Sequence, residues 1–148
     1  MDVELPSDFR EFLRFLADSE VQYLVIGGYA VGYHGYPRAT QDLDIWIART
    51  PENADRMVDV LRRFGFDLPE LNRELFLKAD TIVRMGVPPI RIEVATTLSG
   101  VEFSVCYANR VEEDLGGVQV SLMSLPDLKT NKKAAGRHKD LDDLDHLP

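Results

Sequence analysis

The stretch GGYAVGYHGYPRATQDLDIWIA, residues 27–48, decides the fold. It joins a glycine pair to two carboxylates, Asp42 and Asp44, which stand one residue apart at the start of an apolar run. Charged side chains beside a buried strand are costly unless a partner compensates them. The stretch therefore predicts a site at which Asp42 and Asp44 hold a bound group.

The sequence around the two carboxylates has the pattern of strands and a short helix. Residues 21–26 are almost continuously apolar, which predicts a strand buried on both faces. The glycine pair ends that strand, residues 29–34 are expected to form a short helix, and residues 42–48 form a second strand. Because side chains alternate along a strand, Asp42 and Asp44 are expected to share one face.

The flanking sequence predicts the remaining elements. Helical spacing of apolar residues predicts a helix over 8–18, and Thr50-Pro51 predicts the start of another that stops at Gly65. Residues 90–95 and 118–122 are expected to be strands, and residues 76–86 stay ambiguous, with a strand near 81–85. From Ser124 onward the pattern indicates one or two helices that break near Gly136.

Strands that alternate with helices predict an α/β fold with a mixed β-sheet flanked by helices and a C-terminal helical segment. The length of 148 residues fits a single domain over 1–148. Within it we expect an α/β core over 1–122 and C-terminal helices over 123–148.

Composition restricts the functional classes. The net charge of −8 argues against a protein whose whole surface coats nucleic acid, but it leaves room for a small basic cleft and for bound divalent cations. No apolar run approaches ~20 residues, so we expect no membrane span. The acidic N-terminus does not resemble a signal peptide, and the lone Cys106 cannot form an internal disulfide, so we expect a cytoplasmic protein.

The two motifs have complementary chemistry. Mg²⁺ prefers oxygen ligands and usually takes one or two protein carboxylates together with water and substrate phosphates, which Asp42 and Asp44 can accommodate. Gly27 and Gly28 allow close approach of the backbone to a ligand, and the N–H groups at a helix start favour phosphate. Phosphate at the glycines and metal at the aspartates would together hold a nucleoside triphosphate (NTP).

A third carboxylate, Glu93, lies in the apolar segment IRIEVA, where the pattern calls for an apolar residue. It could help hold a second metal ion, and two metal ions support an in-line displacement at phosphorus. The alternatives are an exposed position on an edge strand, or a salt bridge to Arg91 or Arg84. For the two aspartates, the alternative is solvation at the strand end or pairing with Arg38.

These residues resemble a known signature. An apolar residue, Gly-Gly, thirteen residues and then Asp-apolar-Asp-apolar is similar to the signature of the nucleotidyltransferase superfamily with the DNA polymerase beta-like fold. HGYPRATQDLDI and KKAAGRHKDLDDL resemble the minimal bacterial nucleotidyltransferases of the abortive-infection and toxin–antitoxin type. The resemblance covers residues 21–144, and Glu93 stands where relatives often have aspartate.

The resemblance implies that an acceptor hydroxyl attacks the α-phosphate of an NTP and that pyrophosphate leaves. Asp42, Asp44 and Glu93 would be the catalytic residues and would bind Mg²⁺, with Mn²⁺ as an alternative. Lys132 would neutralise the triphosphate, with Lys139 as a secondary candidate. The implied set that binds the NTP and its metal is Gly27, Gly28, Arg38, Thr40, Lys132, Lys133 and Arg137.

The resemblance leaves the biological role open between three hypotheses. An active enzyme would modify a hydroxyl on an RNA such as tRNA, on a protein or on a small molecule. A toxin would use the same chemistry and would have a cognate antitoxin. The alternative is a catalytically inactive module of the same fold, an antitoxin or regulatory subunit, because the short chain has little room for an acceptor-binding domain.

The C-terminal KDLDDLD contains two further Asp-x-Asp pairs, which serve as an internal comparison. Residues i and i+2 on a helix do not face each other, so Asp142 and Asp145 are expected in solvent. Asp140 and Asp143 are expected to pair with Arg137 or Lys139 at the surface, where such pairs contribute little. The resemblance also allows Asp140 to support the site.

Overall fold

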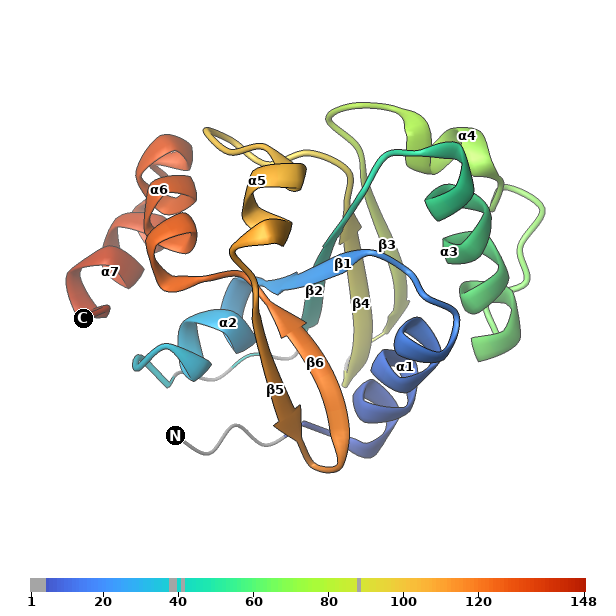
Figure 1. The fold of residues 1–148 in the computed structure, drawn as a ribbon, viewed down its shortest axis with the longest axis horizontal. Helices are drawn as coiled ribbons and strands as arrows, with labels where there is room; N and C mark the ends of the chain where they lie inside the picture. The colour runs from blue at the N-terminus through green and yellow to red at the C-terminus, as the bar shows by residue number, and fades with distance from the viewer. Residues whose placement is uncertain (1–4, 38–39, 41, 88) are drawn as a thin grey trace.

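The structure, a computed structural model, describes residues 5–37, 40, 42–87 and 89–148. One six-stranded sheet in the order β3-β4-β2-β1-β6-β5 forms its centre, with helices around it (Figure 1). The elements in chain order are α1 (Ser7–Asp18), β1 (Tyr23–Ile26), α2 (Gly27–Tyr33), β2 (Asp42–Ile47), α3 (Pro51–Phe64), α4 (Arg73–Leu77), β3 (Ile82–Val87), β4 (Ile90–Ala95), α5 (Phe103–Ala108), β5 (Val111–Leu115), β6 (Val118–Leu122), α6 (Leu125–Ala135) and α7 (His138–His146).

The sheet is mixed, as predicted. β1 runs antiparallel to β2, whereas β2 is parallel to β4 and β1 is parallel to β6. The edge strands β3 and β5 form antiparallel pairs with β4 and β6. The α/β fold class expected from the alternation of strands and helices is therefore confirmed.

Helices pack on the sheet with the apolar faces that the sequence indicates. Helix α1 buries Phe9, Phe12, Leu13 and Leu16, and the Phe12 ring makes an edge contact with Phe64 at the end of α3. The two ends of α3 follow the predicted capping: the Thr50 side chain accepts a hydrogen bond from the Asn53 N–H, and Gly65 ends the helix in the left-handed conformation.

Helices α6 and α7 lie together on the opposite side of the sheet from α3 and α4 (Figure 1). Their predicted break near Gly136 is confirmed, because this glycine is the C-cap of α6 with φ +64°. Among the described residues, no helix is both long and apolar enough to cross a membrane.

Three elements were not predicted. These are the short helices α4 and α5 and the strand β5. Strand β5 carries the acidic residues Glu112, Glu113 and Asp114 in exposed positions, so it lacks an apolar pattern. It forms a hairpin with β6 through Gly116 and Gly117, which have φ values of +64° and +87°.

Candidate active site

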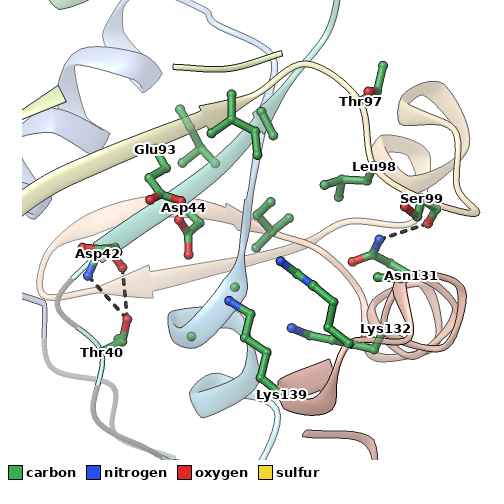
Figure 2. Close-up of a pocket in the computed structure, with 18 of the residues that line it drawn as sticks. Thr40, Asp42, Asp44, Glu93, Thr97, Leu98, Ser99, Asn131, Lys132 and Lys139 are labelled. Atoms are coloured by element: carbon green, nitrogen blue, oxygen red, sulfur yellow. Dashed lines mark hydrogen bonds between the residues drawn. The ribbon is translucent and has the colours of Figure 1, made fainter. Parts of the chain in front are cut away.

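The three predicted carboxylates lie on one face of two adjacent strands. In the parallel pairing of β2 with β4, Asp44 is opposite Glu93 and Asp42 is opposite Arg91. Figure 2 shows the side chains of Asp42, Asp44 and Glu93 next to one another at one end of the cleft. The structure therefore brings together residues that are about fifty positions apart in the chain.

Each glycine of the pair makes room for a residue of the second motif. A Cβ on Gly27 would lie 2.2 Å from Oδ2 of Asp44, and a Cβ on Gly28 would lie 2.7 Å from Cβ of Thr40. The Thr40 hydroxyl donates to the Asp42 carbonyl at 3.3 Å and accepts from the Asp42 N–H at 3.4 Å. The glycine pair thus packs directly against the segment that presents the carboxylates.

Two arginines hold two of the three carboxylates. Arg91 donates to Asp42 from Nε at 3.0 Å, and Arg84 donates to Oε1 of Glu93 from Nε at 2.7 Å. The salt bridge from Glu93 to Arg84 was one of the alternatives for this residue. The pairing of Arg91 with Asp42 was not expected, although Arg91 precedes Glu93 by two residues and so shares its face of β4.

Asp44 has no such arginine partner among the described residues. Burial raises its pKa to about 7, and the hydrogen bond with Glu93 and the charges of Glu93 and Asp42 add to this shift, while Lys139 opposes it. A carboxylate in these surroundings needs a proton or a cation in order to be stable at neutral pH.

The donor chemistry at this end of the cleft fits a hard divalent cation. Asp44 and Glu93 supply carboxylate oxygens side by side, and Mg²⁺ commonly takes two protein carboxylates and completes its shell with water and phosphate. No group of three metal-ligating side chains converges within the described ranges. Asp42 and Glu93 would have to turn away from Arg91 and Arg84 before all three carboxylates could bind one cluster of ions.

Lys132, expected to neutralise a triphosphate, is buried and already paired. Its Nζ lies 3.2 Å from Oδ1 of Asp140 and 3.1 Å from Oδ2 of Asp143. The side chains of both aspartates are 1% exposed, so the expectation that they pair at the surface is wrong, although the expected pairing of Asp140 with Arg137 is present. The reason is tertiary: α7 packs against α6 and encloses the two carboxylates around the lysine. Asp142 and Asp145 are exposed, as predicted.

Arg137 lies between these helices and shares the Asp140 carboxylate. Its Nε donates to Oδ2 of Asp140 at 2.7 Å, and Asp140 also accepts from the Arg137 backbone N–H at the start of α7. Burial of Asp140 opposes the charged form, but the hydrogen bonds from Arg137 and Lys132 lower the pKa of this carboxyl. The Arg137 side chain is nevertheless 65% exposed and lines the cleft.

The other predicted basic residues have different positions. Lys139 lines the cleft, and Figure 2 shows its amino group directed toward the end that holds the carboxylates. Lys133 is exposed and does not contribute to the cleft wall. Arg38 lies outside the described residues. Sequence reasoning therefore ranked Lys132 above Lys139, whereas the geometry gives Lys139 the more direct access to the carboxylates.

The cleft has a volume of about 600 Å³, within the range of small-ligand sites. It extends from the carboxylates to the loop that follows β4 and to α6 (Figure 2). Its lining residues are Ile26, Gly27, Gly28, Thr40, Asp42, Asp44, Ile45, Ile82, Arg84, Glu93, Ala95, Thr97, Leu98, Ser99, Asn131, Lys132, Ala135, Arg137 and Lys139.

Similar structures give this architecture a context. No protein-family model and no curated protein sequence matches the chain. A presumed nucleotidyltransferase from Thermotoga maritima has a similar structure with a TM-score of 0.63 and 15% identity, over 93% of this chain and 88% of its own. An antigenic nucleotidyltransferase-like protein from Paracoccidioides brasiliensis gives a TM-score of 0.54 and 17% identity, over 97% of this chain and 77% of its own. The chain therefore has a nucleotidyltransferase-like fold.

Proposed function

We propose that the protein is a Mg²⁺-dependent nucleotidyltransferase that moves a nucleoside monophosphate from an NTP to an acceptor hydroxyl. The observation that carries this proposal is the register of β2 with β4, which sets Asp44 opposite Glu93, beside Asp42 and against Gly27. Three carboxylates next to a glycine turn, inside a cleft of nucleotide size, fit a metal-bound triphosphate better than they fit an uncharged ligand.

In nucleotidyl transfer, the carboxylates and the glycines would have separate roles. Bound Mg²⁺ or Mn²⁺ would activate the acceptor oxygen and stabilise the departing pyrophosphate. Asp42, Asp44 and Glu93 would hold the metal, and the backbone at Gly27 and Gly28 would lie against the phosphates. The acceptor oxygen would form its bond to the α-phosphorus as the bond from that phosphorus to pyrophosphate breaks.

The basic residues of the C-terminal helices would neutralise the phosphates. Lys139 and Arg137 reach the cleft with exposed side chains, so they are suited to meet the triphosphate directly. Lys132 lines the same cleft, but it is held by Asp140 and Asp143. Its role in the proposal is to fix α6 against α7 and so to place Arg137 and Lys139, and any direct phosphate contact is secondary.

Calorimetric titration of ATP, CTP, GTP and UTP, each with and without Mg²⁺, tests the proposal. The double variant Asp42→Asn/Asp44→Asn is the matched comparison, because it keeps the side-chain size while it removes both negative charges. Mg²⁺-dependent binding that disappears in the double variant would support the proposal. Transfer of label from the bound NTP to an acceptor would then identify the chemistry, and absence of NTP binding would contradict it.

A second function, a catalytically inactive binding module, is favoured by one observation. Arg91 and Arg84 already compensate Asp42 and Glu93, so the site is balanced by the protein's own charges. Such a module would act as an antitoxin or regulatory subunit that binds a nucleotide or a partner without chemistry. Metal-dependent turnover that Asp42→Ala abolishes would exclude it.

The biological role in the proposal is that of a cytoplasmic toxin that modifies tRNA or a protein and is controlled by a cognate antitoxin. Its support is the resemblance of the C-terminal stretch KKAAGRHKDLDDL and the basic residues exposed there, Lys133, Arg137, His138 and Lys139. Expression in a bacterial host should arrest growth, and Asp44→Ala should relieve the arrest. Normal growth with full expression would count against a toxin.

A further inference from the structure

The end of the cleft away from the carboxylates presents a carboxamide in a defined orientation. Nδ2 of Asn131 donates a hydrogen bond of 3.0 Å to the carbonyl oxygen of Ser99. A carbonyl can only accept, so this bond determines which end of the carboxamide is nitrogen. Figure 2 shows the Asn131 oxygen turned toward the cleft, and within the described part of the chain no donor hydrogen-bonds to it.

The surroundings of Asn131 suit a planar, partly apolar group. Ser99 belongs to the loop after β4, and Ile82 and Leu98 line the space beside it. Glu93 lies on β4, and Ala95, the last residue of that strand, lies about 7 Å further along it. The carboxamide is therefore separated from the carboxylates by a strand end and an apolar wall, so one extended ligand could contact both.

We propose that Asn131 recognises the nucleobase of the NTP and selects bases whose Watson–Crick edge carries an amino group next to an unprotonated ring nitrogen, which are adenine and cytosine. This inference rests on the proposed function, because it assumes that the triphosphate binds at the carboxylate end. The Asn131 oxygen accepts a hydrogen bond from the amino group, and the second Nδ2 hydrogen is able to donate to the adjacent ring nitrogen. Ile82 and Leu98 contact the faces or edges of the base.

The selectivity follows from the donors and acceptors of the bases. An asparagine pairs with adenine by accepting from N6 and donating to a ring nitrogen, and cytosine offers the equivalent N4 amino group and N3 acceptor. On the Watson–Crick edge, uracil presents a carbonyl oxygen beside a ring N–H, and guanine presents a carbonyl oxygen and an amino group on either side of a ring N–H. Neither base therefore offers an amino group next to a bare ring nitrogen, which is what the orientation imposed by Ser99 requires. An asparagine that is free to rotate its carboxamide can exchange its donor and acceptor and so pair with either group of bases. Here such a rotation would break the hydrogen bond to Ser99.

The test compares nucleotides on the unaltered protein first. With Mg²⁺ present, ATP or CTP should bind at least about tenfold more tightly than both GTP and UTP, which corresponds to about 1.4 kcal/mol and lies within the range for a well-formed bidentate pair. Purine riboside triphosphate, which lacks only the amino group of ATP, should bind about tenfold more weakly than ATP if adenine is the base. This comparison requires no mutation and so does not depend on the folding of a variant.

The variant Asn131→Leu should then reduce the preference to less than about threefold while Mg²⁺-dependent binding persists. Thr130→Val is the matched control, because Thr130 is exposed on the same helix and its hydroxyl bonds only to Pro126 within the described residues. This control should keep the preference.

The possible results separate the two proposals. If no NTP binds with Mg²⁺, both the function and the base selection are wrong. If all four NTPs bind equally, and Asp42→Asn/Asp44→Asn abolishes that binding, only the role of Asn131 is wrong. Tightest binding of GTP or UTP would also overturn the inference, as would a preference that survives in Asn131→Leu.

Discussion

The carboxylate of Asp44 occupies the space that a side chain on Gly27 would need, because a Cβ there would lie 2.2 Å from its Oδ2. The antiparallel register explains the contact: Ile26, the last residue of β1, is opposite Asp44 in β2. Gly27 has φ +67°, so it also turns the chain in a way that L side chains disfavour. One glycine thus serves both the turn out of β1 and the position of the carboxylate.

Gly27→Ala is therefore expected to affect both stability and ligand binding. The left-handed backbone should cost about 1–2 kcal/mol of unfolding free energy, measurable by urea denaturation. The added methyl group must also displace the Asp44 carboxylate, so calorimetry should show weakened Mg²⁺-dependent NTP binding.

Gly65→Ala separates these two effects. Gly65 also has a positive φ, +116°, but a Cβ there would meet no atom within 4 Å. This control should lower stability and leave NTP binding unchanged. Binding by Gly27→Ala as tight as that of the unaltered protein would show that the contact with Asp44 has no role in ligand binding.

The raised pKa of Asp44 predicts that the stability of the metal-free protein depends on pH. Burial and the neighbouring carboxylates raise this pKa from 3.8 to about 7, so the folded state binds the proton more tightly than the unfolded state. Its stabilising contribution is fully present below pH 3.8 and is lost as pH rises through about 7. Thermal unfolding with EDTA should therefore show a falling Tm across this window, and Asp44→Asn should flatten the fall.

Asp145→Asn provides the comparison for this titration. It removes one carboxylate in the same way, but Asp145 is exposed on α7. It should leave the slope of Tm against pH unchanged. Added Mg²⁺ should raise Tm at pH 8 in the unaltered protein and in Asp145→Asn, but much less in Asp44→Asn. An equal slope in all three proteins would contradict the assignment of the titration to Asp44.

The ion pair between Arg91 and Asp42 predicts competition between arginine and metal. Arg91→Gln should tighten Mg²⁺ binding in the absence of nucleotide by up to about fivefold, since an ion pair exposed to this extent contributes only modestly. Isothermal titration with Mg²⁺ measures the change. Weaker binding would show instead that Arg91 holds Asp42 in the orientation that the metal needs.

Arg73→Gln controls for the lost positive charge. Arg73 makes two short hydrogen bonds to Asp55, at 2.9 and 2.7 Å, and neither residue lines the cleft. Its substitution changes the net charge by the same amount as Arg91→Gln. Mg²⁺ affinity should therefore stay within experimental error in this variant.

The placement of the glycine pair beside Asp42 and Asp44 could be predicted from the sequence, because it depends on short-range rules. Alternation along a strand places Asp42 and Asp44 on one face, and the glycines end the preceding strand. The hairpin of β5 with β6 obeys a rule of the same kind, a Gly-Gly turn between two strands, but the acidic residues of β5 obscured it. Its exposed edge position explains how three consecutive acidic residues can belong to a strand.

The surroundings of Lys132 could not be predicted in this way. The segment KDLDDLD has the pattern of a solvated helix face, and helix geometry alone cannot reveal that another helix covers it. Asp140 and Asp143 are buried because the chain turns at Gly136 and α7 then packs against α6. The same limit applies to Asn131, whose orientation depends on a loop more than thirty residues earlier.

Adjacent lysines on α6 offer a sharp test of the buried charge network. Lys132→Met should lower the unfolding free energy by about 3–5 kcal/mol, because it leaves Asp140 and Asp143 buried with one cation fewer. Lys133→Met makes the same chemical change one residue later at an exposed position, so it should change stability by less than about 0.5 kcal/mol. Urea denaturation of both variants measures the difference. Equal stabilities would mean that solvent reaches the two aspartates, and Lys132 would then be available to bind phosphate.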